Sequence, residues 1–121
     1  MKKPLLVLLL SFGLYAQNIA GTYTGSMKME TPDGPRDASA TIIVKQDGDA
    51  LTITAGPRPE QQQPASKIER SGDGLKFEVV PPEGKGLIQF EVTIKEGKLA
   101  GKLTMTRGDQ SRTAQLDLAK Q

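Results

Sequence analysis

The stretch LIQFEVTIKEGKLAGKLTMT, residues 87–106, contains two runs of alternating apolar and polar residues on either side of Glu96-Gly97. Alternation with a period of two is typical of a β-strand that buries one face. A glycine between two such runs supplies the positive φ that a tight hairpin requires. We therefore predict two long antiparallel strands here. The residues predicted to face the core are Ile88, Phe90, Val92, Ile94, Leu99, Leu103 and Met105.

The same strand pattern recurs along the rest of the chain. Alternating runs occupy residues 21–29, 38–46, 67–70 and 75–80, and two more contain Leu51 with Ile53 and Leu116 with Leu118. Tight turns between consecutive strands favour a meander over a Greek-key sandwich, which needs a long connection between its sheets. Closure of eight strands also removes exposed edges. The predicted fold is all-β: a single-domain, eight-stranded antiparallel up-and-down β-barrel.

The connections are predicted to differ between the two ends of this barrel. In a meander, alternate connections lie at the same end, so the tight turns at residues 47–49, 71–74 and 96–97 share one end with both termini. The other connections are richer in proline and form the mouth. Residues 56–65, GPRPEQQQPA, are expected to be the longest loop, because their three prolines cannot donate hydrogen bonds inside a sheet.

The first residues, MKKPLLVLLLSFGLYA, have the layout of a secretory signal peptide. Lys2 and Lys3 precede a short apolar run, and Ala16 is a small residue suited to cleavage. A membrane anchor is the competing interpretation, but the apolar run is shorter than the ~20 residues that span a bilayer. We therefore expect a signal peptide at 1–16, a barrel domain at 17–121, and a periplasmic or secreted protein.

The composition excludes several classes of function. The chain has 16 basic and 14 acidic residues, and the two lysines of the signal peptide account for this excess. Without a basic excess or a basic amphipathic helix we expect no binding of nucleic acid and no insertion into a membrane. The absence of cysteine means that no disulfide stabilises the fold. The absence of histidine removes the usual general base and the commonest metal ligand.

No pattern of residues points to catalysis. Most carboxylates fall in turns, where Asp is favoured for backbone reasons, and strand alternation directs Glu78, Glu91 and Asp117 outward into solvent. Asp47-Gly48-Asp49 lacks the further oxygen ligands of a calcium loop. Arg107-Gly108-Asp109 resembles an integrin-binding tripeptide, but the same residues are also ordinary hairpin chemistry. We expect no enzyme activity, no metal and no cofactor.

The opening of the first strand resembles a known group of barrels. Gly21-Thr22-Tyr23 is similar to the Gly-x-Trp opening of the calycins, which include lipocalins, avidins and fatty-acid-binding proteins. Residues 21–25 and 45–48 also resemble small secreted bacterial proteins described as lipocalin-like or avidin-like. The resemblance implies a barrel whose closed end is sealed by an aromatic residue under a basic residue of the last strand, here Tyr23 and Lys120. The alternative is that Tyr23 is an ordinary core aromatic.

A binding site is expected at the mouth, because the inward residues there are small or adaptable. Ala38, Ala40, Ala55 and Ala114 leave space, and methionines adapt to what enters it. Arg112, inward at the start of the last strand, is a candidate for meeting a polar head group. The residues predicted to bind a ligand are Met27, Met29, Ala40, Phe77, Phe90, Met105 and Arg112. The alternative is that the mouth loops fold over the alanines and complete an ordinary core.

Two functions remain open at this point. The first is an exported, non-enzymatic barrel that binds a small, mainly apolar ligand at its open end. The second is an interaction module of the cell envelope, or a barrel similar to a protease inhibitor, that acts through its mouth loops on another protein.

Overall fold

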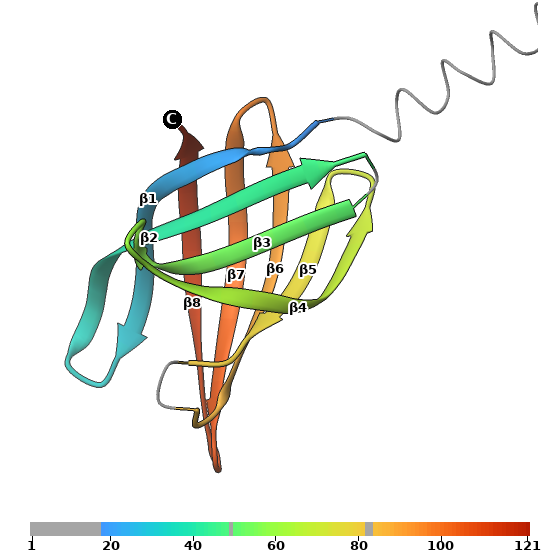
Figure 1. The fold of residues 1–121 in the computed structure, drawn as a ribbon. Coiled ribbons are helices and arrows are strands. Elements are labelled where there is room, and N and C mark those ends of the chain that lie inside the picture. Colours follow the sequence, from blue (N-terminus) through green and yellow to red (C-terminus); the bar gives the residue numbers. More distant parts are fainter. Residues whose placement is uncertain (1–17, 49, 82–83) are drawn as a thin grey trace, which may run out of the picture.

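The computed structural model describes residues 18–48, 50–81 and 84–121. Eight strands follow one another: β1 (Gly21–Thr31), β2 (Gly34–Asp47), β3 (Ala50–Arg58), β4 (Gln61–Ser71), β5 (Gly74–Val79), β6 (Leu87–Lys95), β7 (Lys98–Arg107) and β8 (Gln110–Lys120). Each pairs antiparallel with the next, and β1 pairs with β8, so the sheet closes into a barrel (Figure 1). The predicted fold class is confirmed. The signal peptide predicted for 1–16 lies outside the described residues, among which no helix is long and apolar enough to cross a membrane.

The hairpin of β6 and β7 forms as its sequence predicts. Phe90 lies opposite Leu103, and Ile94 lies opposite Leu99. The turn between the strands has a φ of 54° at Glu96 and 77° at Gly97. Positive φ at both central residues is the geometry whose twist matches that of the flanking strands.

The buried core comes from every strand except β4, which contributes only partly buried residues such as Ala65 and Ile68. Its largest fully buried side chains are Tyr23, Phe77, Ile42, Ile53, Leu99, Leu118 and Val44. Ala38 was predicted to face inward and is instead exposed. The reason is that β2 pairs with β3 only from Thr41 onward, so residues 34–40 continue past the barrel beside β1 (Figure 1).

The loop predicted at residues 56–65 is wrong, because β3 continues to Arg58 and β4 begins at Gln61. The ladder between these strands shifts register between Ala55 and Arg58. Irregularities of this kind, and the turn itself, are positions where a proline costs no ladder hydrogen bond. The predicted short strand at 67–70 is accordingly part of a strand of 11 residues. The long connection is that of residues 80–86 instead.

The side chain of Gln62 supplies polar contacts where the β3–β4 ladder is irregular. Its Oε1 accepts a hydrogen bond from the Thr54 hydroxyl at 2.9 Å. Its Nε2 donates to the backbone carbonyls of Arg58 at 2.8 Å and Thr41 at 3.3 Å. One glutamine thus joins both arms of the hairpin to β2.

Candidate functional site

One end of the barrel, here called the closed end, carries the connections from β2 to β3, from β4 to β5 and from β6 to β7, and it is sealed by side chains. Tyr23 is 1% exposed and its hydroxyl donates a hydrogen bond of 2.7 Å to the carbonyl of Ile19. The amide of Ile19 donates to the side-chain oxygen of Gln46 at 2.9 Å, and its side chain belongs to the core. Burial raises the pKa of the Tyr23 phenol above its ordinary value. The buried side chains of Tyr23 and Ile19 therefore cover the core at this end.

The predicted partner of Tyr23 lies directly opposite it on the neighbouring strand. Tyr23 and Lys120 are register partners of β1 and β8. The aliphatic stem of Lys120 packs over Gly21, where a Cβ would lie 3.1 Å from its Cγ. The contribution of Ile19 was not foreseen, because an isolated isoleucine before the first strand gives no signal of a cap. The cation–π contact between Lys120 and Tyr23 stays a prediction.

The mouth end contains an apolar cavity of about 160 Å³, here called the mouth cavity. Its wall is formed by Met27, Ser39, Ala40, Thr41, Ile42, Ala55, Gly56, Pro57, Val79, Ile88, Phe90, Leu103, Met105 and Leu116. Apolar side chains dominate this wall, as in most small-molecule sites. An engineered protein cavity of roughly this size, about 150 Å³, binds benzene. The mouth cavity therefore has room for a group of about six carbons.

Four of the seven residues predicted to bind a ligand line the mouth cavity. These are Met27, Ala40, Phe90 and Met105. Phe77 lies behind the wall, fully buried, with its ring stacked on Phe90 at a centroid distance of 4.6 Å. It positions Phe90 and has no surface in the cavity.

The other two predicted residues line a separate hollow of about 290 Å³, here called the Arg112 hollow. Met29 and Arg112 form its wall together with Met105, Arg107 and Gln110. Met105 also lines the mouth cavity, so the two spaces share one wall residue. Arg112 is exposed and lies opposite Met105 in the β7–β8 ladder.

A third space, here called the side hollow, adjoins the mouth cavity between the β3–β4 hairpin and the start of the 80–86 connection. It measures about 440 Å³. Its wall consists of Ala55, Gly56, Pro57, Glu60, Gln61, Gln62, Gln63, Val79, Pro81 and Ile88. Sequence reasoning missed most of these residues because it placed 56–65 in a loop. The feature of the sequence that could have pointed to this site is the run of three glutamines between prolines at residues 61–63.

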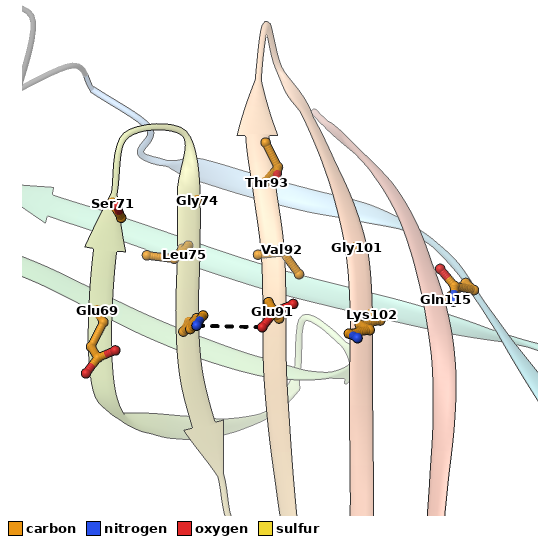
Figure 2. A pocket seen from close by; sticks show the side chains of 11 residues that line it. Glu69, Ser71, Gly74, Leu75, Glu91, Val92, Thr93, Gly101, Lys102 and Gln115 are labelled. Carbon is orange, nitrogen blue, oxygen red and sulfur yellow. Dashed lines mark ion pairs between the residues drawn. The ribbon is translucent and has the colours of Figure 1, made fainter.

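A larger groove of about 450 Å³ lies on the outer face of β4–β8 but is a poor candidate site (Figure 2). Its charges are in register across the strands, with Glu69 opposite Lys76, and Glu91 opposite both Lys76 and Lys102. The Lys76–Glu91 pair is 3.7 Å apart with both side chains well exposed. Cross-strand pairs of opposite charge stabilise a sheet. The charged residues of this groove therefore stabilise the sheet, and their presence does not indicate a binding site.

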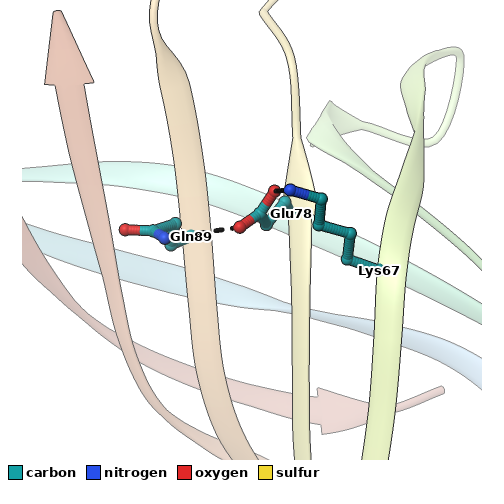
Figure 3. A network of polar contacts seen from close by, with 3 residues as sticks. All are labelled: Lys67, Glu78 and Gln89. Atoms are coloured by element: carbon teal, nitrogen blue, oxygen red, sulfur yellow. Dashed lines mark hydrogen bonds and ion pairs between the residues drawn. The ribbon is translucent and has the colours of Figure 1, made fainter.

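The carboxylate of Glu78, also on the outer face, is bonded to neighbouring side chains of the sheet (Figure 3). It forms an ion pair with Lys67 at 3.5 Å and accepts a hydrogen bond from the Gln89 amide at 3.3 Å. Lys67 has a φ of 52° at a register shift between β4 and β5. In residues 18–48, 50–81 and 84–121, no three acidic side chains cluster closely enough to hold a metal ion.

No family model, curated protein sequence or solved structure matches this chain. The closed barrel of eight antiparallel strands is compatible with a calycin-like fold. Kinship with lipocalins or avidins is therefore a proposal that rests on the opening residues and the shared architecture.

Proposed function

We propose that this protein is an exported, non-enzymatic barrel of calycin type that binds a small, mainly apolar ligand in the mouth cavity. Export is proposed from the layout of residues 1–16. The observation that carries the binding role is the apolar cavity of about 160 Å³ in a barrel whose other end is sealed.

The cost of leaving such a space empty supports this proposal. Protein interiors are packed as densely as organic crystals, with few voids larger than a water molecule. Each Å³ of unfilled apolar cavity costs roughly 24 cal/mol of stability. A ligand that fills the mouth cavity therefore replaces missing contacts and stabilises the fold.

Two alanine-to-leucine variants test the proposal, one in the cavity wall and one outside it. Ala40 lines the cavity, whereas Ala114 is 1% exposed and is absent from its wall. We expect Ala40→Leu to be neutral or stabilising and to abolish binding of p-xylene, followed by NMR titration. Ala114→Leu should overpack the core and cost about 1–3 kcal/mol of unfolding free energy.

The opposite pattern would overturn the binding role. If Ala40→Leu destabilises the protein as much as Ala114→Leu, and the parent protein binds no p-xylene, the mouth is an ordinary core.

The second function, an interaction module or inhibitor that contacts another protein, is favoured by the shape of two hairpins. The β1–β2 and β7–β8 hairpins extend past the barrel at the mouth end (Figure 1). Residues 34–40 of β2 pair with β1 and not with β3. Native mass spectrometry of protein purified from its own compartment distinguishes the two functions, because a carrier retains a small ligand and a module retains a protein partner.

A further inference from the structure

Beside the side hollow, the neighbouring strands β4 and β5 have unequal lengths. β4 begins at Gln61, but its pairing with β5 begins only at Ala65, opposite Val79. β5 ends at Val79 after six residues, and among the described residues no ladder partner on that side is found for residues 61–64 of β4. The side hollow occupies this gap.

The side hollow lies directly beside the mouth cavity. The two spaces share the wall residues Ala55, Gly56, Pro57, Val79 and Ile88. The shared residues are all small or apolar, so a ligand that passed from the side hollow into the mouth cavity would meet no charged group on the way. No comparable set of shared residues joins the cavity to the Arg112 hollow, where Met105 alone lines both spaces.

Gln63 has the polar side chain best placed to hydrogen-bond a ligand in this gap. It is half-buried, lines the side hollow and lies opposite the buried Ala55 in the β3–β4 ladder. Within the described part of the chain its side-chain amide makes no hydrogen bond. The neighbouring Gln62, by contrast, uses its amide on Thr54, Arg58 and Thr41. Gln63 therefore retains a donor and an acceptor for a ligand.

We propose that the side hollow is the entrance to the mouth cavity, and that Gln63 hydrogen-bonds an uncharged polar group at the end of the ligand. The ligand class is a short neutral amphiphile, such as an alcohol, ketone or amide with an apolar tail of about six carbons. A neutral amide satisfies a hydroxyl or carbonyl, but it cannot repay the desolvation of a carboxylate. Glu60, the charged residue of this wall, also disfavours an anion. This inference rests on the proposed binding function.

The test compares three six-carbon probes that differ only in the polar end: 1-hexanol, hexanoate and hexylammonium, titrated by NMR. The parent protein should bind 1-hexanol most tightly. Gln63→Leu should weaken 1-hexanol binding about five- to tenfold, the usual effect of one hydrogen bond, and leave p-xylene binding unchanged. Gln63→Glu should shift the preference to hexylammonium. Gln115→Leu, the same change on the outer face, should alter none of these affinities.

Two results would overturn the inference while leaving the proposed function intact. One is p-xylene binding together with a 1-hexanol affinity that Gln63→Leu does not change. The other is tightest binding of hexanoate that is lost in Arg112→Gln, because the polar end would then lie in the Arg112 hollow. Failure of p-xylene and all three six-carbon probes to bind the parent protein would overturn the proposed function itself.

Discussion

The closed end and the mouth end of this barrel are built from the same repeating hairpin, yet only one of them is filled. At the closed end, Tyr23, Ile19 and Gln46 form a connected set of hydrogen bonds over buried core side chains. At the mouth end, the strands stop at different heights, one ladder shifts register, and an apolar cavity remains. Where paired strands end together and inward residues are bulky, the lumen closes. Where a strand stops early and inward residues are small, space is left.

Removal of a large side chain should reveal this difference most strongly. Leu99 at the closed end is fully buried, whereas Met105 lines the mouth cavity and is partly exposed. We expect Leu99→Ala to cost about 2–5 kcal/mol of unfolding free energy. Met105→Ala should cost roughly 1–2 kcal/mol, because its neighbours already include empty space. Urea denaturation measures both, and equal losses would contradict the contrast between the two ends.

Tyr23→Phe tests the seal of the closed end. The variant leaves the carbonyl of Ile19 without its donor, which should cost about 1–2 kcal/mol. Burial raises the pKa of this phenol in the folded protein above its ordinary value of 10.0. The stabilisation is therefore complete below pH 10 and is lost as the pH rises through the folded pKa, because the unfolded chain releases the proton more readily. The parent protein should lose stability above pH 10 more steeply than Tyr23→Phe, which is measured by denaturation at several pH values. The same dependence of unfolding free energy on pH in both proteins would contradict a raised pKa of the Tyr23 phenol.

Gln62→Ala tests how the mouth end is held together. The change removes the hydrogen bonds to Thr41, Thr54 and Arg58, with an expected cost of about 1 kcal/mol. Amide hydrogen exchange should accelerate in the β3–β4 hairpin and stay unchanged at the closed end. Gln61→Ala, at an exposed neighbour, is the control and should change neither. Uniform acceleration across the barrel would mean that the two ends open as one unit.

The smallest expected effect concerns the turns themselves. Glu96 at the closed end has a φ of 54°, a conformation that asparagine adopts more readily than glutamate. Glu96→Asn should therefore stabilise the protein by about 0.5 kcal/mol, measured by thermal or urea denaturation. Asp33 occupies a turn at the mouth end and does not have a positive φ. Asp33→Asn should have no effect, and a gain there of the same size would show that backbone strain does not explain the result.

The sequence alone was enough to determine the number of strands, the meander and most of the core. These features follow from local chemistry. Alternation assigns each side chain of residues 87–106 to a face, and Glu96-Gly97 sets the turn between two neighbouring strands. The inward positions of Ala40, Phe90 and Met105 follow from the same period of two, and the structure places all three in one cavity wall.

Tertiary structure decided where the barrel is sealed and where it stays open. Residues 56–65 look like a loop because of their prolines, but Gln62 bonds to a carbonyl of Thr41, 21 residues away in the chain, and holds them in a hairpin. Ile19 becomes a cap only through Tyr23 and through Gln46, 27 residues further on. Ala38 has the alternation of a core residue and is exposed, because β3 does not reach it. Such outcomes depend on which distant strand lies beside a residue. A local pattern of polar and apolar side chains does not contain that information.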